Sequence, residues 1–183
     1  MEFIKVEHPH HVLAEKCEKL YLTAFPDYER KPIDLLYLHQ TNRQSDMFAV
    51  VNDTQEFIGL VVTIHTSNTV VLEYLAVDPN QRNQNYGSKI LQNLSAQYPD
   101  HHIFLEIEPI NEGQAGDILR QRRRQFYERN GYHFLDQQVN YFTTQLELMS
   151  NQIQHHDQFI FEDYIQPYID VYGNNVTNDV YLI

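Results

Sequence analysis

A polar stretch between a predicted strand and a predicted helix has the composition of a phosphate-binding loop. The β-prone run Val70 to Val77 ends at Asp78-Pro79, where proline removes a backbone donor and stops the strand. Polar residues 80 to 85 follow, and a helix is predicted to open at Tyr86-Gly87 because apolar residues then recur at helical spacing. The first N–H groups of a helix lack intrahelical partners and lie at the positive end of its dipole. The stretch therefore predicts binding of an anionic group such as a phosphate.

The loop carries a family resemblance. Its residues Arg82 to Gly87, RNQNYG, resemble the Arg/Gln-x-x-Gly-x-Gly/Ala loop of the GNAT acetyltransferase superfamily, and LAVDP before it resembles the family's strand end. One position departs from the pattern, since Asn85 stands where the family has its first glycine. Asparagine is the non-glycine residue that best tolerates left-handed backbone geometry, so the turn is expected to survive. Taken alone, the loop is also compatible with an ordinary strand-loop-helix connection.

A second motif follows in the family's order. The segment Arg124 to Tyr132, RQFYERNGY, resembles the superfamily's Phe-Tyr-Glu-x-x-Gly-Phe/Tyr segment, and LEIE at Leu105 to Glu108 resembles the strand between the two motifs. The departure here is a longer, arginine-rich insertion between Asn111 and Tyr127. The resemblance implies one domain over residues 1–183 with the acyl-CoA N-acyltransferase fold. That fold is α/β, with a mixed, mostly antiparallel central sheet flanked by helices on both faces.

The resemblance also implies the cosubstrate. In the family, main-chain amides of the loop wrap the pyrophosphate of acetyl-CoA, and Arg82 would add charge to a phosphate. Backbone amides of the preceding strand would pair with the pantetheine arm and polarise the acetyl oxygen. The residues expected to contact acetyl-CoA are Leu75, Ala76, Val77, Arg82, Asn83, Gln84, Asn85, Tyr86, Gly87 and Ser88.

Acetyl transfer to a primary amine needs a base, because amines are largely protonated near neutral pH. The two-residue strand period places Glu106 and Glu108 on one face of a predicted strand. The superfamily's protein N-terminal acetyltransferases carry their base at the position matching Glu106, so Glu106 ranks first. Glu73 ranks second, because other members recruit a carboxylate from that strand. Tyr127 matches the family tyrosine proposed to protonate the leaving thiolate; solvated glutamates and a core tyrosine are the structural alternatives.

Composition narrows the function classes. The formal net charge of −12 argues against nucleic acid and anionic membranes as partners, and it favours cationic acceptors such as amines. The single cysteine, Cys17, has no partner for an internal disulfide, and the start of the chain has no targeting pattern. No apolar run approaches the roughly 20 residues of a membrane span. These features predict a cytoplasmic monomer or homodimer, and no metal is expected because no Cys/His spacing matches a closed zinc site.

Hydrophobic periodicity predicts the remaining elements. The expected strands are Phe3–Glu7, Asp46–Val51, Phe57–His65, Val70–Val77, Ile103–Glu108, Tyr132–Asp136 and Tyr141–Met149. The expected helices are His11–Phe25, one from Pro32, Gly87–Tyr98, Asp117–Asn130 with Asp117 as N-cap, and a kinked closing helix within Asp157–Gly173.

Three functions are compatible with these patterns. The first is an N-acetyltransferase that moves acetyl from acetyl-CoA to a primary amine of an unidentified acceptor by direct attack. The second is a non-catalytic regulatory module that retains the acetyl-CoA pocket. The third is an unrelated α/β nucleotide binder without preference for CoA over ATP.

Overall fold

Eight strands form the frame of the computed structural model, which describes residues 1–41, 44–111, 113, 116–152 and 159–183. The hydrogen-bonded strand order is β1-β2-β3-β4-β5-β7-β6-β8. The chain divides into two compact units, residues 1–64 with 72–97 and residues 65–71 with 98–183. Strand β4 contributes residues to both. One domain over residues 1–183 stays a prediction.

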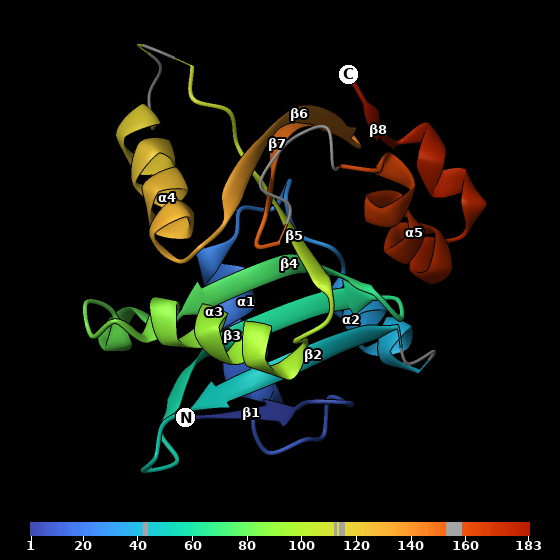
Figure 1. The fold of residues 1–183 in the computed structure, drawn as a ribbon. Helices are drawn as coiled ribbons and strands as arrows, with labels where there is room; N and C mark the ends of the chain where they lie inside the picture. Colours follow the sequence, from blue (N-terminus) through green and yellow to red (C-terminus); the bar gives the residue numbers. More distant parts are fainter. Residues whose placement is uncertain (42–43, 112, 114–115, 153–158) are drawn as a thin grey trace. The chain divides into compact units, whose positions relative to one another are not determined.

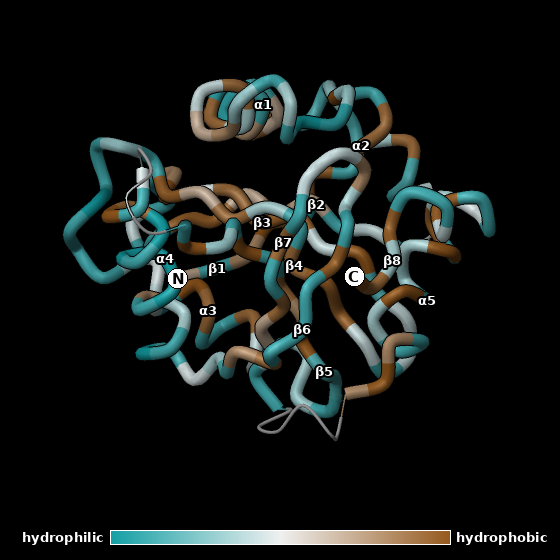
Figure 2. The backbone as a smooth tube through the Cα atoms, turned by 90° about the horizontal axis from the view of Figure 1, so that it is seen from above, coloured by the Kyte–Doolittle hydropathy of each residue, from teal (hydrophilic) through white to brown (hydrophobic). Residues whose placement is uncertain are grey.

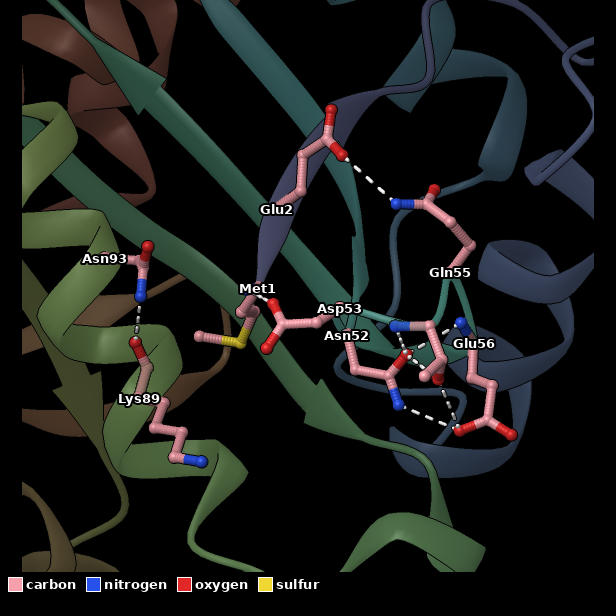
Figure 3. A network of polar contacts seen from close by, with 9 residues as sticks. Met1, Glu2, Asn52, Asp53, Gln55, Glu56, Lys89 and Asn93 are labelled. Carbon is pink, nitrogen blue, oxygen red and sulfur yellow. Dashed lines mark hydrogen bonds and ion pairs between the residues drawn. The ribbon is translucent and has the colours of Figure 1, made fainter.

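The first unit contains an antiparallel meander (Figure 1). Its strands are β1 (Glu2–Lys5), β2 (Ser45–Val51), β3 (Phe57–His65) and β4 (Thr69–Val77). Figure 3 shows the β2–β3 turn, where the Asn52 side chain accepts from the Glu56 N–H at 2.9 Å and donates to the Glu56 carboxylate at 2.8 Å. The asparagine side chain thus replaces backbone partners within the turn.

Three helices belong to the first unit, and two of them share one face of its strands. Helix α1 (Ala14–Ala24) and helix α2 (Ile33–Gln40) lie on one face, and α3 (Tyr86–Gln97) lies on the other (Figures 1 and 2). Alternate strand residues such as Leu60 and Val62 are buried with Leu20 and Leu36 in one hydrophobic cluster. The two-residue period of the strands and the helical spacing of the apolar residues thus produce the same core.

The second unit contains β5 (His102–Ile107), β6 (His133–Tyr141), β7 (Thr144–Ser150) and β8 (Val180–Leu182). Strand β5 pairs in parallel with the start of β4, from Thr69 to Val71, whereas β5 with β7, β7 with β6, and β6 with β8 pair antiparallel. Helix α4 (Asp117–Arg129) and helix α5 (Phe161–Tyr172) lie on opposite sides of these strands (Figures 1 and 2). A 3₁₀ turn, Asn174–Asn178, joins α5 to β8.

The mixed, mostly antiparallel α/β architecture is confirmed. Several helix boundaries differ from the predictions. Helix α1 begins at Ala14, and Val12 before it is 85% exposed, so the helix predicted from His11 begins three residues later than expected. Helix α2 begins at Ile33, and Pro32 stands just before it. The N-cap of α4 is Gly116, with φ 94°, and Asp117 is the first helical residue.

The last strands also differ from the prediction. Strand β6 continues to Tyr141, and β7 begins only at Thr144. Phe142, with φ 53°, turns the chain between them. No glycine or proline marks this hairpin, which is why the turn was not predicted. Parts of the predicted loops 111–116 and 150–156, and the start of the predicted closing region at Asp157, lie outside the described residues.

Candidate active site

The predicted phosphate loop has the backbone geometry that Asn85 was expected to permit. Asn83 and Asn85 have φ values of 63° and 60°, both in the left-handed region. Before them, the Asp78 side chain accepts from the Asn80 N–H at 2.9 Å and so caps the 3₁₀ turn Pro79–Gln81. The prediction that Asn85 replaces a glycine without loss of the turn is confirmed in its backbone conformation.

The start of α3 presents backbone donors directly after this turn. The Lys89 N–H donates to the Asn85 carbonyl at 3.2 Å, the first bond of the helical pattern. The N–H groups of Tyr86, Gly87 and Ser88 precede this bond and have no acceptor of the i−4 type within the helix. These three donors, with the partial positive charge of a helix start, fit an anionic group.

Two cationic side chains belong to the same segment. Arg82 is exposed, and its Nε donates to the Val77 carbonyl at 3.3 Å, which ties the loop to the end of β4. The Lys89 ammonium lies 5.3 Å from the centre of the Tyr86 ring. At that distance the ammonium and the ring attract each other, and the charge is held near the first turn of α3.

The end of β4 alternates between core and partly exposed positions. Tyr74 and Ala76 belong to the hydrophobic cluster, whereas Leu75 and Val77 are half-buried. The ladder with β5 covers Thr69 to Val71, so residues 75–77 lie beyond it. Gly59 of β3 approaches this segment closely, since a Cβ there would lie 2.3 Å from the Ala76 carbonyl oxygen. The absence of a side chain at position 59 therefore allows β3 to lie this close to the end of β4.

Glu73 is already paired with a cation. Its carboxylate forms an ion pair and hydrogen bond with the Lys31 ammonium. The position of Lys31 is fixed by α1, because its backbone N–H donates to the Tyr21 hydroxyl at 2.7 Å. Burial lowers the pKa of the nearby His39, the Lys31 charge adds to that lowering, and the Glu73 charge opposes it. The Glu73 carboxylate is therefore already engaged by a cation of the chain itself.

Glu106 is held in a different way. Its Oε1 accepts hydrogen bonds from the Tyr164 hydroxyl at 2.6 Å and the Tyr168 hydroxyl at 2.5 Å. Both donors come from α5, and both are neutral. These two contacts therefore orient the carboxylate, and neither of them adds a positive charge.

Tyr127 lies on the last turns of α4. Its ring centre is 5.2 Å from that of Phe126 and 5.9 Å from that of Tyr132. Burial raises the pKa of Tyr127, with the Arg123 charge acting in the opposite direction. In the part of the chain that the structure describes, its hydroxyl donates to no protein group. The phenol is thus a protonated donor at neutral pH.

Glu108 does not accompany Glu106. Strand β5 ends at Ile107, and the Glu108 carboxylate pairs with Arg120 at 3.5 Å and with Arg123 at 3.2 Å. The two carboxylates that the strand period placed together are held by different helices, α5 and α4. Arg124 also pairs with Glu147, so the charges of the arginine-rich insertion are largely balanced by carboxylates.

The predicted residues fall in both units. The first unit holds the predicted acetyl-CoA contacts, residues 75–77 and 82–88, together with Glu73. The second holds Glu106 and Tyr127. Sequence reasoning missed Lys31, Tyr164 and Tyr168 as partners of the glutamates. Only the i, i+4 spacing of the two tyrosines gave a signal, because it places both on one face of a helix.

The histidines form no metal centre within the described ranges. No group of three or more His, Cys, Asp or Glu there is arranged to hold an ion. Among the described residues no helix is both long and apolar enough to cross a membrane.

The fold is a mixed α/β sheet, and its loop before α3 has the left-handed turn described above. Residues 44–134 match the model of the acetyltransferase (GNAT) domain. This segment of the chain carries a GNAT acetyltransferase domain. No curated protein matches the chain in sequence.

Solved structures share the fold at low sequence identity. A putative GNAT-family acetyltransferase from Bacteroides thetaiotaomicron has a TM-score of 0.77 at 21% identity, covering 94% of this chain and 99% of that one. An aminoglycoside 6'-N-acetyltransferase complexed with coenzyme A has a TM-score of 0.62 at 17% identity, with coverage of 82% and 96%. The spermidine N-acetyltransferase of Vibrio cholerae, in complex with CoA and spermine, has a TM-score of 0.58 at 13% identity, with coverage of 81% and 93%.

Proposed function

We propose that the protein is an acetyl-CoA-dependent N-acetyltransferase acting on a primary amine. The observation that carries the proposal is the left-handed backbone of Asn83 and Asn85 directly before the start of α3. That geometry supports a role for the N–H groups of residues 86–88 in binding the pyrophosphate. The register of β4 supports a role for residues 75–77 in pairing with the pantetheine arm, since they lie beyond the ladder with β5.

The proposed transfer is a direct attack without a covalent enzyme intermediate. The amine nitrogen, after giving a proton to the Glu106 carboxylate, attacks the thioester carbonyl carbon and forms the new C–N bond. The C–S bond breaks, and the CoA thiolate leaves with a proton from the Tyr127 hydroxyl. The amide nitrogen, which still carries one extra proton after the C–N bond has formed, releases it to solvent, and solvent then reprotonates Tyr127 and accepts the proton from Glu106. Binding both substrates together makes the attack effectively intramolecular.

The acceptor is proposed to be a small cationic amine. The net charge of −12 attracts cations. Two of the similar structures are an aminoglycoside and a spermidine N-acetyltransferase, which makes these two classes of amine the first to test.

A non-catalytic acetyl-CoA-binding module is the second candidate. It is favoured by one observation, namely that both candidate bases already have partners: Glu73 pairs with Lys31, and Glu106 accepts from two tyrosines. Such a module would bind acetyl-CoA tightly without consuming it.

The two candidates are separated by an assay for free CoA thiol. The protein is incubated with acetyl-CoA and, in turn, spermidine, kanamycin, lysine or a tetrapeptide with a free N-terminus. We expect amine-dependent thiol release with at least one acceptor. The Glu106→Gln variant should lose about 100-fold in rate near neutral pH and recover part of it at higher pH, where the amine deprotonates unaided. If the protein binds acetyl-CoA but releases no CoA thiol in the presence of any amine, the non-catalytic module is the better description.

A further inference from the structure

Two tyrosines of the closing helix converge on a single carboxylate oxygen. The hydroxyls of Tyr164 and Tyr168 both donate to Glu106 Oε1, at 2.6 and 2.5 Å. The two tyrosines are 0% and 1% exposed. A buried phenol that lacks a partner costs free energy, so these hydroxyls and this carboxylate satisfy one another.

The closing helix is built to present this pair. Tyr164 and Tyr168 are four residues apart in α5, which places them on one face of the helix, and Pro167 lies between them. Each ring is fixed by a further aromatic contact, since the Tyr164 ring lies 5.9 Å from that of Phe104 and the Tyr168 ring 5.9 Å from that of Tyr141. The hydroxyls are therefore aimed by packing and have little freedom to turn away.

Both tyrosine hydroxyls act as hydrogen-bond donors to the Glu106 carboxylate. Hydrogen bonds to an ionised carboxylate are shorter and stronger than neutral ones. Burial, followed by the charge of Glu106, raises the pKa of Tyr164 well above its ordinary value, so this phenol keeps its proton and remains a donor. The contrast with Glu73 is direct, because Lys31 neutralises that carboxylate, whereas the phenols orient Glu106 without adding charge.

We propose that Tyr164 and Tyr168 are positioning residues that hold the Glu106 carboxylate ready to receive the amine proton. The inference rests on the proposed function, in which Glu106 is the base. It makes α5, which lies outside both family motifs, part of the catalytic machinery. The two phenols act through Glu106 and touch neither the acetyl donor nor the amine.

The test compares Tyr164→Phe, Tyr168→Phe and the double variant with Tyr181→Phe, an exposed tyrosine of β8 in the same unit. Melting temperature, affinity for acetyl-CoA, and kcat and KM are measured with the fastest amine of the panel above. We expect each single variant to lose about tenfold in kcat, the cost of one charge-assisted hydrogen bond, with acetyl-CoA affinity unchanged. The acid limb of the rate profile should move to higher pH, because the carboxylate has lost a donor that favours its charged form.

A purely structural role predicts a different pattern. Variants that melt earlier but keep the kcat and the acid limb of the unaltered chain would overturn the inference, as would losses equal to those of Tyr181→Phe. If the double variant does not fold, the single variants decide the question. Absence of transfer by the unaltered chain with every amine would overturn the proposed function and this inference together. Transfer by the unaltered chain with unaffected variants overturns this inference alone.

Discussion

The Lys31 ammonium and the Glu73 carboxylate form an ion pair whose side chains are only 13% and 4% exposed. Removing one member of such a pair leaves the other buried and uncompensated. We expect Glu73→Gln to lower the free energy of unfolding by about 3 kcal/mol, measured by urea titration.

The matched control for this pair is Asp27→Asn. Asp27 also pairs with an arginine, Arg30, but its side chain is 92% exposed. Its loss should cost less than about 1 kcal/mol, because exposed pairs contribute little. Equal costs for the two variants would contradict a structural role for the Lys31–Glu73 pair.

The backbone conformation at position 85 is predicted to limit which residue types can stand there without loss of acetyl-CoA binding. The φ at this position is 60°, a left-handed conformation that is unfavourable for alanine by about 1 to 2 kcal/mol and nearly neutral for glycine. Asn85→Ala should therefore weaken acetyl-CoA binding by about tenfold, and Asn85→Gly should bind at least as tightly as the unaltered protein. Asn80→Ala, in the 3₁₀ turn just before, is the control and should change the affinity little. Equal affinities for Asn85→Ala and Asn85→Gly would show that the left-handed turn does not govern binding.

Tyr127 is predicted to donate the proton to the leaving CoA thiolate and so to affect kcat. Tyr127→Phe keeps the ring contacts with Phe126 and Tyr132 but removes the proton donor, so kcat should fall by at least about tenfold with little change in acetyl-CoA affinity. Gly87→Val should show the opposite signature, with affinity lost first, because a side chain at the helix start crowds the pyrophosphate. Steady-state kinetics and calorimetry separate the two effects. Equal losses of affinity in both variants would remove Tyr127 from the catalytic residues.

Cys17 is predicted to be unreactive in the folded protein. Burial, with a smaller contribution from the Glu18 charge, raises the pKa of the Cys17 thiol to about 12. Since the thiolate is the reactive species, alkylation at pH 8 should be on the order of a thousandfold slower than in denaturant, where the pKa is about 8.5. The folded pKa exceeds the unfolded one, so the associated stability is complete below about pH 8.5 and is lost as the pH rises toward 12. Iodoacetamide labelling followed by mass spectrometry measures the rate, and rapid labelling of the folded chain at pH 8 would contradict the burial of the thiol.

The parts of the fold that follow from local chemistry were predictable from the sequence. Asn85 takes left-handed geometry because of its residue type, and Gly131, with φ 84°, follows α4 in the conformation typical of a glycine after a helix. The N-cap of α4 was assigned to Asp117, but Gly116 occupies it, since both residue types suit a helix start and only the backbone decides.

The partners of the candidate bases were not predictable, because they come from distant parts of the chain. Glu73 is 42 residues from Lys31, and Glu106 is 58 and 62 residues from its two tyrosines. A strand period says which face a glutamate occupies but not which helix packs there. The period also failed for Glu108, because β5 ends one residue before it.

Calorimetric titration of the folded, unaltered protein with acetyl-CoA, CoA and ATP tests the central claim most directly. The geometry of Asn83, Asn85 and the start of α3 predicts binding of acetyl-CoA and CoA and no comparable binding of ATP. Failure to bind either CoA species, in protein shown to be folded by circular dichroism, would contradict the acetyl-CoA assignment and the acetyltransferase function with it.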